Sequence, residues 1–211
     1  MGAYDANDGK TASGKNGDKG DYTFSSGIWQ TVWMEPVQQK YITQLKLIPE
    51  LKNNRLQLTA LTEGKDLRVV ATAYADNKQV ATATGTDHNA FYLDISNPHV
   101  WSPEDPFLYQ LKVELKDKEG RTVDQVDSYF AMRSIGIGKV DGINRTLLNG
   151  KFQFQIGVLD QGYWPDGIFT APTEAALLYD IELAKKLDLT SSANISKWSP
   201  CAGTITVTGL A

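Results

Sequence analysis

Several residues in one short segment have side chains suited to contacting a substrate. The segment from Leu159 to Pro172 reads LDQGYWPDGIFTAP and holds the acids Asp160 and Asp166, the amide Gln161 and the indole of Trp164. Acids and amides form hydrogen bonds, and an aromatic ring offers a flat apolar face. The same composition fits a structural loop whose Trp164 fills a core, and the residues alone leave both interpretations open.

Two predicted elements flank this loop and would position it. The apolar run from Phe154 to Val158 predicts a strand, and the segment from Thr173 to Leu187 predicts a helix. Thr173 can cap that helix, with Glu174 in its first turn. The apolar residues of the helix recur along one stripe, namely Ala176, Leu177, Ile181, Ala184 and Leu187. A strand, a loop and an amphipathic helix form the opening unit of an α/β domain, in which loops after strands carry substrate contacts.

The middle of the chain has a different pattern, in which short apolar alternations are separated by turn residues. Between Tyr41 and Arg133 the period is two, which predicts strands with one buried and one solvent-facing side. The buried side of the last strands is predicted to hold Tyr109, Leu111, Val113 and Phe130. Turns are predicted at Asn53-Asn54, Asp76-Asn77, Asp87-His88-Asn89 and Glu119-Gly120. Strands at this spacing predict a mainly β fold, with an antiparallel immunoglobulin-like sandwich over residues 38–133.

Two local signals add detail to this prediction. The segment from Asn97 to Pro106, NPHVWSPEDP, contains three prolines and cannot form a central strand. We expect it to cross from one sheet to the other, with Trp101 capping an end of the core. Further along, Asn149-Gly150 predicts the tip of a hairpin.

The first part of the chain is predicted to contain little regular structure. Residues 1–22 are mostly small and polar, a composition typical of flexible segments. The segment from Ser25 to Val37 is rich in tryptophan and β-branched residues and predicts a strand. Trp29 and Trp33 are too large to remain exposed, so we expect this strand to belong to another domain.

The composition argues against several classes of partner. The chain of 211 residues has a net charge of −4 and no cluster of lysine and arginine, which argues against nucleic acid. No apolar run approaches the length of a membrane span, so no membrane is predicted as a partner. His88 and His99 lie in separate turns, so we predict no metal site, and no motif indicates a cofactor. The single Cys201 leaves the cellular compartment open.

Five stretches of the chain resemble, in their order, the family 2 glycoside hydrolases, which include β-galactosidases, β-glucuronidases and β-mannosidases. They are SGIWQTVWMEPV, NPHVWSPEDPFLYQLKVEL, SYFAMRSIGI, LLNGK and GVLDQGYWPDGIFTAPTEAALLYDIELAKKL. That family combines a sugar-binding jelly roll, an immunoglobulin-like sandwich and a (β/α)8 barrel. The resemblance implies that residues 1–37 are a remnant of the jelly roll, residues 38–133 the sandwich, and residues 134–187 the first strand-helix unit of an incomplete barrel.

The resemblance also implies a chemistry. The family cleaves β-linked sugars with two glutamates, an acid/base and a nucleophile, both on later barrel strands. Asp160, Gln161, Trp164 and Asp166 would then contact carbohydrate in the intact enzyme. None of six glutamates matches the catalytic motifs, so this chain alone is predicted to be inactive: Glu35, Glu104, Glu114, Glu119, Glu174 and Glu182. The alternative is a non-enzymatic sandwich that serves as a binding or spacer module.

The resemblance stops at Leu187. Residues 188–211 are rich in threonine, serine and glycine and are unlike the rest of the chain. With permitted codons, a shifted reading frame of this tail can spell GLDKLRKHIKVEPVRWYYHCDRLG, which resembles the family's continuation. We therefore hypothesise that the tail is out of frame and that the parent gene encodes a longer enzyme.

Overall fold

The computed structural model describes residues 32, 34–160, 164, 171–187, 189 and 191–194. The chain divides into two compact units, each with its own sheets. One unit is Glu35–Phe154, and the other combines Met1–Met34 with Gln155–Ala211.

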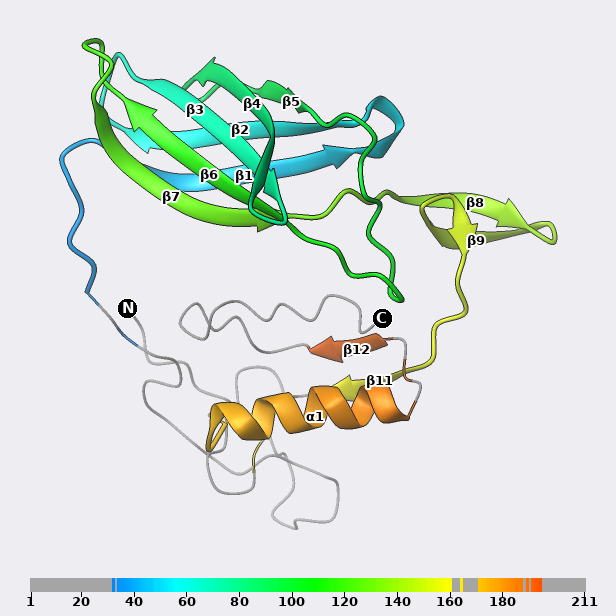
Figure 1. Cartoon of the computed structure of the whole chain (residues 1–211). Helices are drawn as coiled ribbons and strands as arrows, with labels where there is room; N and C mark the ends of the chain where they lie inside the picture. The colour runs from blue at the N-terminus through cyan, green and yellow to red at the C-terminus, as the bar shows by residue number, and fades with distance from the viewer. Residues whose placement is uncertain are drawn as a thin grey trace, which may run out of the picture. The chain divides into compact units, whose positions relative to one another are not determined.

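The first unit contains two antiparallel sheets that form separate layers (Figure 1). One sheet has the strand order β1-β2-β5, and the other has the order β4-β3-β6-β7. The strands are β1 (Tyr41–Glu50), β2 (Arg55–Glu63), β3 (Arg68–Ala75), β4 (Lys78–Thr86), β5 (Phe91–Asp94), β6 (Tyr109–Lys116) and β7 (Thr122–Phe130), and the 3-10 helix η1 (Leu51–Asn53) joins the first two. The prediction of a mainly β, antiparallel fold is confirmed.

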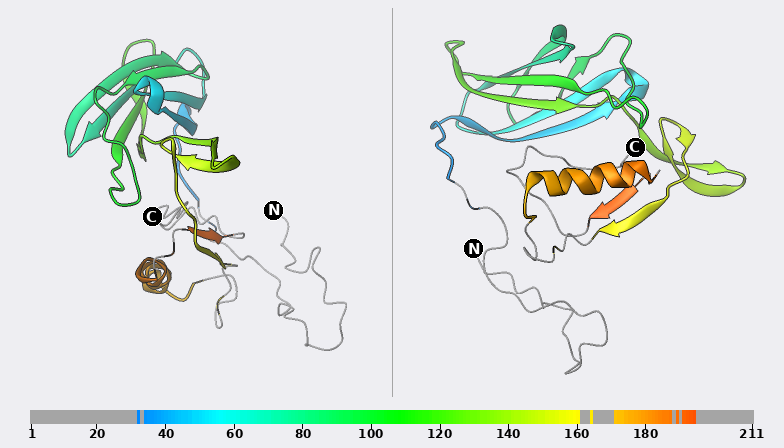
Figure 2. Two further views of the ribbon diagram at one scale, coloured as in Figure 1. Left: turned by 90° about the vertical axis from the view of Figure 1, so that its right-hand side faces the viewer. Right: turned by 60° about the horizontal axis from the view of Figure 1, so that its bottom comes forward.

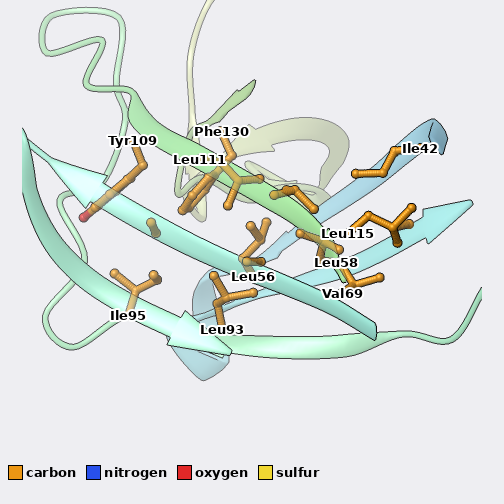
Figure 3. Packing of buried hydrophobic residues seen from close by; sticks show 14 of the residues in the cluster. Ile42, Leu56, Leu58, Val69, Leu93, Ile95, Tyr109, Leu111, Leu115 and Phe130 are labelled. Carbon is orange, nitrogen blue, oxygen red and sulfur yellow. The ribbon is translucent and has the colours of Figure 1, made fainter. Parts of the chain in front are cut away.

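Apolar side chains from both sheets fill the space between them (Figure 3). Because alternate residues of a strand point to opposite faces, the predicted alternation becomes one buried face on β2 and on β6. The predicted core residues are all buried, namely Trp101, Tyr109, Leu111, Val113 and Phe130. Burying one large apolar side chain contributes roughly 1.5–3 kcal/mol, so this core is the main source of stability of the unit.

The predicted turns contain residues in the left-handed backbone region. Asn54 has a φ of 50°, Asp76 and Asn77 have 48° and 62°, His88 has 60° and Gly120 has 80°. Glycine, asparagine and aspartate adopt this region at lower cost than other residues. The turn residues therefore set the points at which the chain reverses between strands.

The segment from Asn97 to Pro106 connects β5 of the first sheet with β6 of the second, so the predicted crossover is confirmed. The backbone N–H of Trp101 donates a hydrogen bond to the carbonyl of Met132 (3.0 Å). The backbone N–H of His99 donates to the hydroxyl of Tyr109 (2.7 Å). These bonds fix the crossover to the strand that follows it and to Met132, which lies just after β7.

A small antiparallel sheet, in the order β10-β9-β8, completes the first unit. Its strands are β8 (Ile135–Val140), β9 (Ile143–Leu148) and β10 (Lys151–Phe152). Asn149 and Gly150 both have positive φ, 50° and 77°, and form the predicted hairpin tip. The Asn149 side chain accepts from the N–H of Ser134 (2.9 Å) and donates to the carbonyl of Trp101 (2.9 Å). The hairpin is thereby fixed to the crossover segment, and the compact unit extends to Phe154.

The second unit contains a strand, a helix and a second strand, which are β11 (Gly157–Asp160), α1 (Glu174–Lys186) and β12 (Ser191–Asn194). The two strands pair in parallel, next to the helix in the right-hand view of Figure 2. The hydroxyl of Thr173 accepts a hydrogen bond from the N–H of Ala176 (3.1 Å), so the predicted helix cap is confirmed. Along the predicted stripe Ala184 is buried, whereas Leu187, at the end of the helix, is 63% exposed.

Two predicted strands differ from the structure. The strand expected over Phe154 to Val158 begins at Gly157 instead, where pairing with Ser191 starts, so backbone pairing rather than apolar composition sets its start. Val32 and Met34 to Val37 form no strand, contrary to the prediction for Ser25 to Val37. The rest of that segment lies outside the described residues.

Candidate functional site

The residues predicted to contact substrate follow the end of β11. Asp160 is the last residue of that strand. Trp164 is half-buried and takes part in an isolated backbone bridge. Gln161 and Asp166 lie outside the described residues. The structure therefore places the first two residues of the predicted loop, Leu159 and Asp160, at the end of a strand, and it does not bring the four side chains together into a described site.

The strand β12 adds a residue to this edge that the sequence analysis did not identify. In the parallel register Asp160 pairs with Asn194, and both are the last residues of their strands. The carboxyl ends of parallel strands lie at one edge of a sheet, which is where α/β folds bind ligands. No signal in the sequence pointed to Asn194, because the Ser/Thr-rich tail was not predicted to form a strand.

The glutamates of the described residues have the environments of surface groups. Glu114 lies 3.6 Å from the ammonium of Lys116, and Glu119 lies 3.3 Å from the guanidinium of Arg121. The other four glutamates considered as catalytic candidates are exposed: Glu35, Glu104, Glu174 and Glu182. An acid that donates a proton at neutral pH needs a raised pKa, which burial or a neighbouring negative charge would provide.

One buried acid, Asp117, borders a cavity of 330 Å³ that is also lined by Arg68, Lys116 and Lys118. Its carboxylate accepts hydrogen bonds from the backbone N–H groups of Glu119 (3.1 Å) and Arg121 (2.9 Å) and from the Arg121 guanidinium (2.8 Å). Burial raises the pKa of Asp117, but the hydrogen bonds from Arg121 outweigh it and hold the pKa below the usual 3.8. Asp117 therefore stabilises a turn in its charged form and is unsuited to donating a proton.

The two histidines lie apart, each beside one acid. The Nε2 atom of His99 is 2.6 Å from the Asp105 carboxylate, and that of His88 is 3.9 Å from Asp87. Within the part of the chain that the structure describes, no three His, Cys, Asp or Glu side chains are grouped to hold a metal ion. Among the same residues, no helix has the length and apolar character needed to cross a membrane.

Comparison with known proteins finds one protein-family model that matches most of the first unit. Residues 29–133 match the family model described as "Glycosyl hydrolases family 2". The β-galactosidase of Halalkalibacterium halodurans is 28% identical over 144 residues, which cover 62% of this chain and 14% of that protein. The β-galactosidase large subunit of Leuconostoc lactis is 28% identical over 137 residues, which cover 59% of this chain and 22% of that protein. The chain thus spans less than a quarter of the length of either relative.

A solved structure with the same fold is the β-glucuronidase from Ruminococcus gnavus in complex with D-glucuronic acid. It superimposes with a TM-score of 0.65 at 17% sequence identity, covering 76% of this chain and 27% of the glucuronidase. At that identity the likeness concerns the fold.

Proposed function

Because this chain belongs to the family 2 glycoside hydrolases, we propose that it is part of a longer enzyme that hydrolyses β-linked sugars. One observation carries this proposal. The segment that matches the family model, residues 29–133, is followed in the same chain by the strand β11 and the helix α1. A family 2 enzyme has this order of parts, in which a β domain leads into a barrel of alternating strands and helices.

The same proposal assigns a role to each part of the chain. We infer that the two sheets of residues 38–133 are an immunoglobulin-like sandwich, which agrees with their seven antiparallel strands in two layers. Residues 134–187 would be the start of a (β/α)8 barrel, to which β11 and α1 contribute the first strand and helix. Residues 1–37 would be the remnant of a jelly roll, and residues 188–211 an out-of-frame tail.

The proposed reaction needs two carboxylates that this chain would not supply. A retaining glycosidase places a nucleophilic carboxylate and an acid/base carboxylate on opposite sides of the scissile bond, about 5–5.5 Å apart. In the longer enzyme these groups would come from later barrel strands. The described glutamates are exposed or paired with cations and give no such couple.

The loop after β11 would hold the substrate rather than react with it. Substrates of barrel enzymes bind at the carboxyl ends of the strands, and Asp160 ends β11. Asp160, Gln161 and Asp166 would form hydrogen bonds with sugar hydroxyls. Trp164 would offer an indole face to the sugar ring.

The loop assignment is tested in the enzyme obtained by restoring the reading frame after Leu187. Trp164→Ala and Asp160→Asn should each lower kcat/KM about tenfold or more, equivalent to about 1.4 kcal/mol of transition-state stabilisation. Tyr179→Ala is the matched control, since Tyr179 is a 61% exposed aromatic on α1, and it should leave kcat/KM unchanged. Unchanged kinetics in both loop variants, with the fold intact, would reduce the loop to a structural element.

An activity assay of the 211-residue chain tests the proposal. It should give no turnover of aryl β-galactosides, β-glucuronides or β-mannosides, because it lacks the carboxylate pair. The frame-restored enzyme should hydrolyse one of these substrates. Turnover by the short chain that disappears when one of its own acids is replaced would refute the assignment of catalysis to later strands.

A further inference from the structure

The turn between β9 and β10 contains the dipeptide Asn149-Gly150, which has a chemistry of its own. The backbone nitrogen of the residue after an asparagine can attack the side-chain amide carbon and close a five-membered succinimide ring. Glycine hinders this attack least, because it has no Cβ. Asn149 is therefore a candidate for deamidation, a modification that needs water and no enzyme.

Hydrogen bonds hold the Asn149 side chain away from that reaction. Its Oδ1 atom accepts from the N–H of Ser134 (2.9 Å), and its Nδ2 atom donates to the carbonyl of Trp101 (2.9 Å). The backbone N–H of Asn149 also donates to the carbonyl of Ser134 (2.8 Å). Because ring closure needs the side chain to turn toward the nitrogen of Gly150, the two side-chain bonds must break first.

The backbone of the turn adds a second restraint. Asn149 and Gly150 have φ values of 50° and 77°, and they join Leu148 to Lys151, which pair between β9 and β10. The succinimide ring requires the Cβ atom of Asn149 and the nitrogen of Gly150 to lie on the same side of the Cα–C bond. The left-handed region, with ψ of about +30 to +60°, holds these two atoms on opposite sides. The strand pairing that fixes the turn therefore also opposes ring closure.

We propose that Asn149 is a deamidation site that the folded chain keeps closed, and that its reaction detaches the small sheet β8-β9-β10 from the crossover segment. The nitrogen of Gly150 loses its proton and forms a bond to the side-chain amide carbon of Asn149. The bond from that carbon to the amide nitrogen breaks, and ammonia leaves. Water then opens the ring at one of its two carbonyl groups and leaves aspartate or isoaspartate.

The product lacks a group that the anchor needs. A carboxylate still accepts from the N–H of Ser134, but it has no proton to donate to the carbonyl of Trp101, so two oxygens would face each other there. Isoaspartate also adds a carbon to the backbone of the turn, which disturbs the pairing of Leu148 with Lys151. Deamidation would therefore turn a transient opening of the small sheet into a lasting one.

The reaction rate of the full chain, measured by peptide mass spectrometry at mildly alkaline pH in buffer and in concentrated urea, tests whether the site is closed. Asn16-Gly17 is the same dipeptide elsewhere in the chain, and in urea the two sites should react at similar rates. Asn149 should react about tenfold or more slowly in buffer than in urea, because the reaction waits for local opening. Equal rates of Asn149 in buffer and in urea would overturn the proposal.

Asn149→Asp tests the consequence of the reaction, followed by amide hydrogen exchange of the full chain. The amides of β8 and β9 should exchange about tenfold or more faster than in the wild type, while those of β3 and β6 keep their rates. Asn144→Asp is the matched control, because Asn144 is an exposed residue of β9 whose side chain has no hydrogen bond among the described residues. Its exchange should equal that of the wild type.

Two results of the exchange experiment would refute the anchoring role of Asn149. One is wild-type exchange of β8 and β9 in Asn149→Asp, and the other is equal loosening of these strands in Asn144→Asp. Deamidation at Asn149 is independent of the proposed hydrolysis of sugars, because neither measurement needs a substrate or an active enzyme. Either proposal can therefore fail while the other stands.

Discussion

The two units of this chain bury their apolar side chains to very different degrees. In the unit Glu35–Phe154, residues such as Leu56, Leu58 and Val113 have no exposed surface. In the other unit the helix α1 has a single buried residue, Ala184. Leu178 and Leu183 of that helix are 45% and 39% exposed, and Leu187, directly after the helix, is 63% exposed. The same kinds of side chain thus form a closed core in one unit and an open surface in the other.

The first unit is the part of the chain whose apolar surfaces are covered by its own contacts. Two sheets packed face to face cover each other's apolar surfaces, so the first unit is complete as a layered structure. A single strand-helix-strand unit leaves part of its helix and sheet uncovered, and in larger folds neighbouring units supply the missing cover. The segment that matches the family model falls almost entirely within the closed unit.

The largest loss of stability is expected for a substitution in the core of the closed unit. Phe130 is 5% exposed, and its ring stacks on that of Tyr109 with centroids 5.0 Å apart. Phe130→Ala should lower the free energy of unfolding by roughly 3–5 kcal/mol, because it leaves a cavity. Leu187→Ala, on the open helix, should change the unfolding of the first unit by less than about 0.5 kcal/mol. Chemical denaturation followed by far-UV circular dichroism measures both, and equal effects would refute the contrast between the units.

The sequence predicted the closed unit well because its signals are local. Period-two alternation identifies the buried face of each strand, and Asn-Gly or Asp-Asn pairs mark the reversals at Asn149 and Asp76. The helix cap at Thr173 is likewise a local hydrogen bond. Contacts between distant segments gave no such signal. The Asp124 side chain accepts from the N–H of Ile42 (2.8 Å) at an irregularity of β1, and no pattern in either segment indicates it.

The candidate site was less predictable than the fold. The segment from Leu159 to Pro172 was identified by residue types, and the structure locates its first two residues, Leu159 and Asp160, at the end of the strand β11. The start of that strand and the existence of β12 depend on pairing between Gly157 and Ser191 across an intervening helix. Such pairing is long-range, so alternation within either segment does not reveal it. The contacts of Asp160, Gln161, Trp164 and Asp166 with substrate stay a prediction.

A smaller effect is expected within the first unit, where one glycine in a main sheet is closely packed and one glycine in the hairpin is not. A Cβ atom built on Gly85 of β4 would lie 2.2 Å from the Phe91 ring, so the ring packs directly on the glycine backbone. Gly85→Ala should therefore cost roughly 1–3 kcal/mol through overpacking. Gly136 in the hairpin strand β8 has nothing within 4 Å of the same position. Gly136→Ala should therefore leave the free energy of unfolding nearly unchanged.

Thermal and chemical unfolding of the two glycine variants provide the measurement. Adding Phe91→Leu to Gly85→Ala should recover part of the lost stability, because the smaller side chain makes room for the new methyl group. The inference that Phe91 packs closely on β4 is wrong if Gly85→Ala is as stable as the wild type. It is also wrong if Gly136→Ala loses as much stability as Gly85→Ala.

The smallest expected effect concerns the turn after β6, where Asp117 is held by Arg121. Burial raises the pKa of Asp117, and the hydrogen bonds from the Arg121 side chain and backbone lower it by more, so the folded-state pKa lies below 3.8. A carboxyl group with a lowered pKa binds its proton less readily in the folded state than in the unfolded state. Its contribution to stability is therefore fully present above about pH 4 and is lost as the pH falls through the folded-state pKa.

Asp117→Asn keeps the shape of the side chain and removes its charge, so it isolates this contribution. At neutral pH the variant should be less stable than the wild type, and the difference should shrink as the pH falls below 3.8, measured by chemical denaturation at each pH. Glu119→Gln is the matched control, because the Glu119 carboxylate is 59% exposed and also contacts Arg121. Exposed ion pairs contribute little to stability, so the free energy of unfolding of this control should differ only slightly from that of the wild type at neutral pH. A deficit of Asp117→Asn that stays constant down to the lowest pH would show that the turn depends on the hydrogen-bonding shape of the side chain and not on its charge.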